Sequence, residues 1–199
     1  MRTMTVTSIL LILAGAALAG PVFTITPMDA GPDKWYEGPT GFETAVPPLG
    51  WTASSTNPDS RWIQYGAQPY EGNYCAAVLM DIMGAPVDAW LGFNYSYTAN
   101  QYLHFALKGQ TSVTATLRLY VGEDLVFDMA NDWTLPADQW GLVEVDLSTT
   151  NYAGFPNVAF DWVYTGTFAP SIYLDAVGIT EETVAAEVAE WGAVKSIFR

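Results

Sequence analysis

The nonapeptide Ser171-Ile-Tyr-Leu-Asp-Ala-Val-Gly-Ile179 has the pattern of a β-strand that closes a sheet. Its apolar residues alternate with Tyr173 and Asp175, and a period of two suits a pleated strand with one buried face. The apolar phase shifts at Ala176-Val177, which indicates a β-bulge or burial on both faces. We therefore expect this stretch to close the fold.

Asp175 needs an explanation, because an unpaired charge among apolar strand residues is costly to bury. Glu43 lies near the other end of the domain sequence. If the terminal strands are neighbours, the two carboxylates can share one Ca²⁺ at roughly 2.3–2.6 Å, with backbone carbonyls completing the shell. We predict a structural calcium site at Glu43 and Asp175. The alternative is two hydrogen-bonded carboxylates at strand ends.

The first 19 residues have the pattern of a secretory signal peptide. Met1–Ser8 carries one charged side chain, Ile9–Ala16 is apolar, and Ala17-Leu18-Ala19 fits a small-residue cleavage pattern. The apolar run is too short for a stable membrane span. We therefore predict export to the cell exterior, a β domain over residues 20–179 and a tail over 180–199. No membrane insertion is expected after cleavage.

The chain is acidic, with a formal net charge of −14 that becomes −15 when cleavage removes Arg2. Such a surface repels phosphate backbones and anionic membranes, so we expect no nucleic-acid partner. Cys75 is the single cysteine, so no intrachain disulfide can form. Its apolar neighbours indicate a buried, unreactive thiol.

Period-two alternation predicts further strands along the chain, at 22–26, 74–80, 88–91, 102–108, 113–121, 125–127, 143–147 and 158–164. Gly122-Glu123 can supply a two-residue hairpin turn. We interpret Pro47–Trp51 as a turn and Asn57–Gln68 as a polar surface loop. His104 is expected to face outward from a half-buried strand. Short strands with turn signals between them, and no helical period before residue 180, predict an antiparallel β-sandwich.

The tail over 180–199 has apolar residues near helical spacing. Its acidic residues come early and its basic residues late, an order that interacts favourably with the dipole of a helix. Two interpretations stay open: a helix docked on the sandwich, and a sorting or attachment tail.

Four motifs in order resemble the choice-of-anchor J family, related to cleaved-adhesin and MAM-like modules. They are Gly41-Phe-Glu-Thr…Pro47-Pro-Leu-Gly-Trp51, Asp88-Ala-Trp-Leu91, Gln139-Trp-Gly-Leu-Val-Glu-Val-Asp-Leu147, and Val158-Ala-Phe160 followed by Tyr173-Leu-Asp-Ala-Val177. The resemblance implies a secreted or surface-displayed jelly-roll sandwich that serves adhesion or glycan binding. Gly92-Phe93-Asn94 replaces the family's Ile-Ser-Pro, and Asp175-Ala-Val177 replaces its Asp-Asp-Val.

Aromatic residues supply the candidate ligand-binding site. Trp62, Tyr65 and Trp133 lie in segments predicted to be polar loops, and Tyr102 lies on the outward face of its strand. Exposed rings on a rigid scaffold can stack on sugar faces. The alternative is that these rings anchor loops onto the sandwich. The remaining tryptophans beside apolar strands are assigned to packing: Trp51, Trp90, Trp140 and Trp162.

Catalytic signals are weak. The lone histidine lacks a nucleophile elbow, a zinc site would need more than one His and one Cys, and no Gly-rich phosphate loop is present. A glycosidase needs only two carboxylates, and Glu144/Asp146 and Asp128/Asp132 are candidate pairs. Such acids usually form a solvated face. We therefore assign no catalytic residue and expect a protein that is not an enzyme.

These observations predict an exported, non-catalytic binding module that recognises a glycan or another extracellular polymer. Two alternatives remain. One is a surface or matrix protein that self-associates through exposed edge strands. The other is a glycoside hydrolase or lyase.

Overall fold

The computed structural model describes residues 23–28, 42–57, 59–79, 86–95, 101–110, 115–149, 157–164 and 171–181. The predicted signal peptide lies outside these residues, as does all of the predicted tail except Thr180 and Glu181. The described residues form the following elements: β1 (Phe23–Met28), β2 (Trp51–Ser55), β3 (Arg61–Tyr65), β4 (Cys75–Leu79), β5 (Val87–Phe93), β6 (Tyr102–Gly109), β7 (Ala115–Val121), β8 (Asp124–Asp128), α1 (Met129–Asp132), β9 (Trp140–Asp146), a 3-10 turn η1 (Leu147–Thr149), β10 (Val158–Tyr164) and β11 (Ile172–Thr180).

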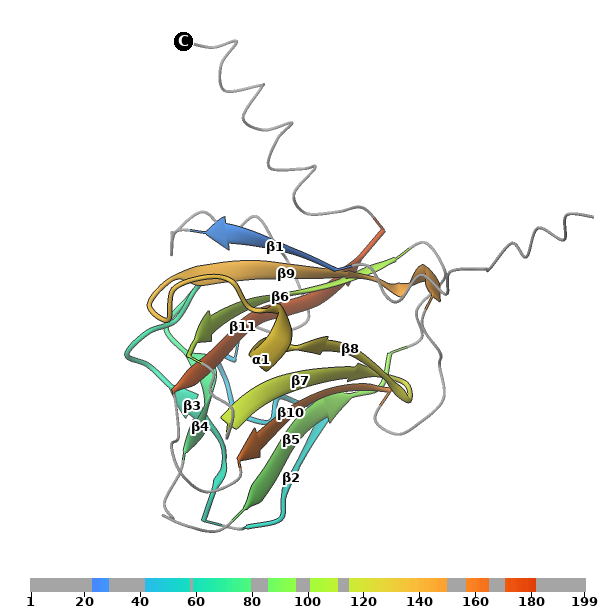
Figure 1. Ribbon diagram of the computed structural model, residues 1–199. Coiled ribbons are helices and arrows are strands. Elements are labelled where there is room, and N and C mark those ends of the chain that lie inside the picture. Colours follow the sequence, from blue (N-terminus) through green and yellow to red (C-terminus); the bar gives the residue numbers. More distant parts are fainter. Residues whose placement is uncertain are drawn as a thin grey trace, which may run out of the picture.

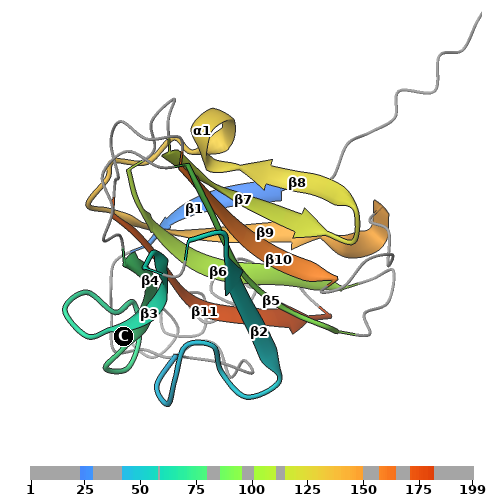
Figure 2. The same ribbon diagram turned by 90° about the horizontal axis from the view of Figure 1, so that it is seen from below.

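These strands pair antiparallel in two sheets that face one another (Figure 1). The six-stranded sheet has the order β1-β9-β6-β11-β4-β3, and the five-stranded sheet has the order β2-β5-β10-β7-β8. From β8 to β11 the chain crosses between the sheets at every step, as in a jelly roll. The predicted antiparallel β-sandwich is therefore confirmed. Figure 2 shows β5, β10 and β7 side by side in the five-stranded sheet.

The core lies between the sheets and follows from the alternation of each strand. In β10, for example, Val158, Phe160, Trp162 and Tyr164 are buried, whereas the residues between them are half-buried. Ring contacts run through this core with centroid distances of 4.4–6.1 Å: Phe42–Trp51, Trp51–Phe93, Phe105–Phe160, Phe105–Phe127 and Phe23–Phe127. Such aromatic pairs stabilise a core beyond their buried area.

The closing strand β11 contains the predicted bulge. Its register with β6 shifts between Asp175 and Gly178, and Ala176 adopts a positive φ of 48°. The bulge turns both Asp175 and Ala176 to the outer side, while Leu174 and Val177 pack in the core.

Two expectations about strand placement are wrong. The first and last strands are not neighbours, because β9 and β6 lie between β1 and β11. Most of the predicted loop at 57–68 is ordered around strand β3. The predicted turn at Pro47–Trp51 is confirmed by a hydrogen bond of 3.0 Å from the Trp51 N–H to the Pro48 carbonyl, and β2 begins at Trp51. β3 pairs with the apolar strand β4, and β2 pairs with β5, which is distant in the sequence. The polar residues within a segment do not reveal such partners.

The outer face of the six-stranded sheet is largely covered. A second apolar cluster packs there, made of Tyr70, Cys75, Ala106, Trp140 and Ala176. The buried Cys75 agrees with prediction.

His104 lies on this covered face and is 0% exposed. The expectation that this strand is half-buried is therefore wrong, because β6 is a central strand that is covered on both faces. Glu144 lies opposite His104 on β9 and is also buried, contrary to the expected solvated face.

Among the described residues, no helix has the length and apolar composition needed to cross a membrane. The four-residue α1 lies between the levels of the two sheets beside β7 and β8, so it covers neither outer face (Figure 1).

Candidate functional site

The outer face of the five-stranded sheet contrasts with that of the six-stranded sheet, because most of its side chains reach solvent. We call it the open face. Its outward side chains are half-buried or exposed, with the exception of Thr116, and they are Thr52, Ser54, Asp88, Trp90, Thr116, Arg118, Tyr120, Ala159, Asp161 and Val163. They point outward because their sequence neighbours fill the core.

One row of residues crosses the whole open face. Strand pairing places Ser54 opposite Trp90, Trp90 opposite Asp161, Asp161 opposite Arg118, and Arg118 opposite Asp128. Directly opposed side chains in a sheet lie about 4.5–5.5 Å apart at Cβ, so each member stands beside the next. The row therefore joins an aromatic ring, a guanidinium group and two carboxylates.

A second row runs beside the first and contains small residues. Gly92 lies between Thr52 on β2 and Ala159 on β10, and Ala159 lies opposite Tyr120 on β7. Tyr120 therefore stands beside small residues in this row. From strand spacing and rise, the Cα atoms of Trp90 and Tyr120 are about 12 Å apart.

The charges of the open face are partly neutralised. Nε of Arg118 lies 3.7 Å from Oδ2 of Asp128, and the two side chains are 36% and 14% exposed. Burial raises the pKa of Asp161 to about 6; the charge of Asp88 adds to this rise, and Arg118 opposes it. Asp161 can therefore accept or donate a proton near neutral pH.

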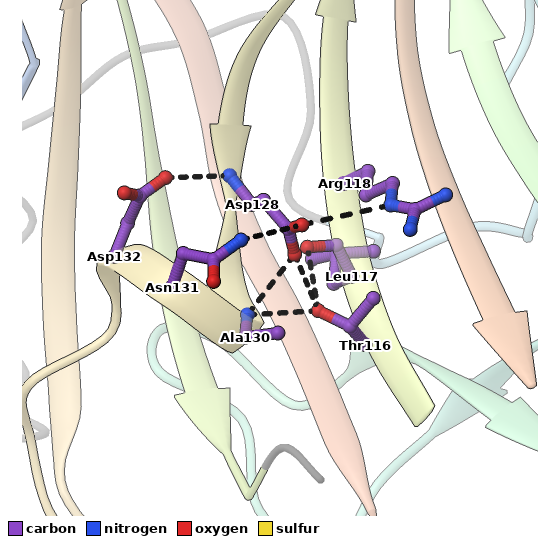
Figure 3. Close-up of polar contacts among 7 residues, drawn as sticks. All are labelled: Thr116, Leu117, Arg118, Asp128, Ala130, Asn131 and Asp132. Carbon is purple, nitrogen blue, oxygen red and sulfur yellow. Dashed lines mark hydrogen bonds and ion pairs between the residues drawn. The ribbon is translucent and has the colours of Figure 1, made fainter. Parts of the chain in front are cut away.

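Asp128 is held in a local network (Figure 3). Its Oδ1 accepts hydrogen bonds from Oγ1 of Thr116 at 2.8 Å and from the Ala130 N–H at 3.1 Å, which caps α1. Its Oδ2 accepts a bond from Nδ2 of Asn131, and Asp132 accepts one from the Asp128 N–H. The predicted candidate pair Asp128/Asp132 therefore serves to fix the end of β8 and α1, and Asp128 positions Arg118.

Trp62 is not an exposed platform. Its ring is 3% exposed and packs in the core, with Nε1 donating to the Ala89 carbonyl at 2.9 Å. The polar residues around it in the sequence belong to an edge strand whose inward face is buried. Trp62 instead lines a groove of about 560 Å³ between the edge strands β2 and β3.

The other three predicted aromatic residues do not come together. Tyr65 is half-buried and lies against Tyr173, with a centroid distance of 5.5 Å, on the outer face of the six-stranded sheet. Tyr102 is half-buried at the start of β6, opposite Asp146 and Thr180. Trp133 packs against the core, where a Cβ at Gly141 would lie 2.8 Å from its ring.

Glu43 and Asp175 converge on one short segment, residues 70–74. Oε1 of Glu43 accepts hydrogen bonds from the N–H groups of Asn73 and Tyr74 at 2.8 and 3.2 Å. Oδ2 of Asp175 accepts from those of Tyr70 and Glu71 at 2.9 and 3.1 Å. The two carboxylates thus bind backbone donors on either side of Gly72.

The predicted calcium site stays a prediction. Within the described residues, no group of three or more His, Cys, Asp or Glu side chains is gathered as a metal site. A shared ion would need ligands from Glu43, Asp175 and backbone carbonyls, as expected from the sequence. Burial raises the pKa of Asp175 to about 7, although its three backbone donors oppose the rise.

Period-two alternation in the strands predicted at 113–121 and 158–164 is enough to place Arg118, Tyr120 and Asp161 on outward faces, but it does not show that they share one site. Trp90 was assigned to packing, which is wrong: it points away from the core that Ala89 and Leu91 fill. The missing signal was non-local, because β5, β10 and β7 are far apart in sequence. The other three tryptophans do pack: Trp51 and Trp162 in the core between the sheets, and Trp140 in the second apolar cluster on the outer face.

No protein-family model matches the sequence, and no curated protein matches it. The resemblance to choice-of-anchor J domains therefore remains a prediction.

Several solved structures are similar to this chain in their fold. One is the Endo-D glycoside hydrolase domain from Streptococcus pneumoniae R6, at 21% sequence identity and a TM-score of 0.47. The match covers 66% of this chain and 22% of that chain. A carbohydrate-binding module of the β-sandwich superfamily, described for promiscuous specificity, matches at 14% identity, 73% and 62% coverage and a TM-score of 0.48. TmCBM61 in complex with β-1,4-galactotriose matches at 11% identity, 67% and 90% coverage and a TM-score of 0.42.

The chain thus spans about a fifth of the Endo-D chain and under two thirds of the second match.

Proposed function

We propose that the protein is an exported, non-catalytic carbohydrate-binding module that holds a glycan chain across the open face. The observation that carries this proposal is the row Ser54–Trp90–Asp161–Arg118–Asp128, which places an aromatic ring beside paired polar groups on a solvent-facing sheet.

The chemistry of the open face suits sugars. A pyranose ring has apolar C–H faces that pack on aromatic rings, and its hydroxyl groups both donate and accept hydrogen bonds. Trp90 and Tyr120 offer two half-buried rings separated by the length of a short oligosaccharide. Between them, the Arg118 guanidinium can donate to a hydroxyl oxygen, and the Asp161 carboxylate can accept from a hydroxyl group.

The scaffold supports binding without rearrangement. All outward residues of the two rows lie in paired strands rather than in loops. Asp128 and its network restrain Arg118, so little side-chain entropy is lost when a ligand is bound.

The test is binding to a panel of neutral polysaccharides that includes cellulose, xylan, mannan, galactan and chitin, measured by affinity electrophoresis and pull-down. We expect Trp90→Ala and Tyr120→Ala each to weaken binding about tenfold or more, since stacked aromatic rings dominate contact energy. Tyr74→Ala is the matched control, because Tyr74 is 40% exposed and lies off the open face, next to β4.

Two results would contradict the proposal. One is a wild-type protein that binds no polymer of the panel. The other is equal binding by wild type, Trp90→Ala and Tyr120→Ala.

A second candidate function, glycoside hydrolysis, is favoured by one observation. Asp88 and Asp161 are diagonal neighbours on β5 and β10 beside Trp90, with about 7–8 Å between their positions on the backbone. Inverting glycosidases hold their carboxyl groups about 6.5–9.5 Å apart. With the pKa of Asp161 raised to about 6, this residue would be the acid and Asp88 the base. Sugar release that Asp161→Asn abolishes, while polysaccharide binding persists, would favour the enzyme over the binding module.

A further inference from the structure

The outer face of the six-stranded sheet contains a polar hollow of about 620 Å³, away from the open face. It lies where β1, β9 and β6 meet the segment before Tyr70. Its lining residues are Met28, Ala67, Gln68, Pro69, Lys108, Asp138, Gln139 and Trp140. Its volume falls within the range of about 300–1,000 Å³ that small-molecule sites in proteins occupy.

The pairing of the strands defines the floor of the hollow. Met28 lies opposite Trp140, and Lys108 lies opposite Tyr173 on β11. Leu107, which precedes Lys108, pairs with Gly141, which follows Trp140. Lys108 and Trp140 are therefore neighbours on the same face. The Trp140 ring is fixed by an edge contact with Tyr70 at 5.6 Å. The lysine therefore stands on a rigid apolar floor.

The ammonium group of Lys108 has no ion-pair partner among the described residues. Arg118, in contrast, is paired with Asp128. The nearby carboxylate of Asp175 accepts hydrogen bonds from the backbone N–H groups of Tyr70, Glu71 and Ala176 and forms no ion pair with Lys108. A positive charge in a hollow of a chain with net charge −14 is thus available to a ligand.

The rim adds neutral and acidic groups around this charge. The carboxamides of Gln68 and Gln139 can donate and accept hydrogen bonds, and the Asp138 carboxylate accepts them. Asp138 would repel a compact inorganic anion. It would instead accept from a hydroxyl group of a ligand whose own carboxylate faces Lys108.

We propose that this hollow binds an acidic sugar, a uronic acid residue with its carboxylate on Lys108 and its hydroxyl groups on Asp138 and the two glutamines. This site goes beyond the proposed function and does not depend on it, because the hollow and the open face lie on opposite sheets. The ligand is held by charge and hydrogen bonds, with Trp140 and Met28 beneath the ring.

The experiment is titration of the full chain with glucuronic and galacturonic acid and their oligomers, followed by NMR and calorimetry. Glucose and galactose serve as neutral analogues, and acetate as a simple carboxylate. At the hollow, followed through the NMR signals of its lining residues, we expect uronate binding that weakens with salt, little binding of the neutral sugars, and little binding of acetate.

Lys108→Met keeps the apolar stem and removes the charge, and we expect it to weaken uronate binding at least tenfold. Arg61→Met is the matched control, because it changes the net charge equally at a residue that does not line the hollow. Gln68→Ala, at an exposed rim residue, provides a second variant in which the fold is not at risk. Trp90→Ala alters the open face alone, so it reports any uronate bound there and separates the two sites.

Three results would overturn the proposal. They are no uronate binding by the wild type, unchanged binding by both Lys108→Met and Gln68→Ala, and acetate binding as tight as that of the uronates.

Discussion

At the scale of single residues, the buried His104 makes the fold sensitive to acid. Its side chain is 0% exposed at the centre of the six-stranded sheet. Burial lowers the pKa of His104 to about 3, because the charged imidazolium would lose its hydration. In the unfolded chain the pKa returns to about 6.5. The neutral histidine therefore contributes stability that is complete above pH 6.5 and is lost as the pH falls toward 3.

We predict that His104→Leu flattens the acid side of the stability profile. The unfolded wild type gains a proton that the folded protein does not, so lowering the pH from 6.5 to 5 should cost about 2 kcal/mol through this residue. The measurement is urea unfolding of both proteins at these two pH values. Because Asp161 and Asp175 titrate in both proteins, the difference between the two profiles isolates His104. An equal loss in wild type and variant would contradict the prediction.

At the scale of elements, the segment from Tyr70 to Tyr74 is held by carboxylates from two distant parts of the chain. Asp175 binds its first N–H groups and Glu43 binds its last. The segment in turn covers the outer face of the six-stranded sheet through Tyr70. Gly72 stands between the two carboxylates with a positive φ of 64°.

We predict that Gly72→Ala destabilises the protein by about 1–3 kcal/mol, because its φ strains an L-residue and the added Cβ would overlap Oε1 of Glu43. Gly66→Ala is the matched control: its Cβ would lie 3.2 Å from the Tyr74 ring and Gly66 carries no positive φ. Thermal unfolding of the two variants should show a larger drop in Tm for Gly72→Ala. A larger drop for Gly66→Ala would show that this segment is not restrained as described.

The same segment allows a test of the predicted calcium site. Glu43→Ala should lower Tm with or without metal, because Asn73 and Tyr74 lose the acceptor of their N–H groups. If calcium also binds between Glu43 and Asp175, a chelator should lower the Tm of the wild type and have no further effect on Glu43→Ala. A wild-type Tm that a chelator leaves unchanged would exclude the ion.

At the scale of the whole molecule, net charge opposes folding. A formal charge of −14 on 199 residues makes the compact state repel itself. Within the described residues, one ion pair, Arg118–Asp128, offsets this repulsion. The acids are otherwise spread over both sheets, so their mutual repulsion acts over distances that salt can screen.

We predict that Tm rises when NaCl is increased from about 10 to 300 mM, because the Debye length falls from about 30 Å to under 10 Å. The measurement is thermal unfolding at constant pH. Equimolar ionic strength from a second neutral salt, such as KCl, provides the control for ion-specific effects. A fall in Tm over this range would show that the ion pair outweighs the general repulsion.

The amino-acid sequence by itself determined the local structure of most strands. Alternation predicted β10 and β11 closely, Gly122 marks the hairpin turn with a φ of 63°, and the phase shift marked the bulge at Ala176. These features depend on contacts between residues that are near in sequence, where side-chain period and backbone φ suffice. The antiparallel sandwich followed from the same pattern.

Only the tertiary structure decided which strands are neighbours and which faces are covered. Period-two alternation separates two faces of a strand but does not say what packs on either one. Trp62 is therefore buried in a segment that looks polar, and Trp90 reaches solvent from one that looks apolar. The open face and the Lys108 hollow exist because strands distant in the chain pair side by side, and that pairing is set by burial across the whole molecule.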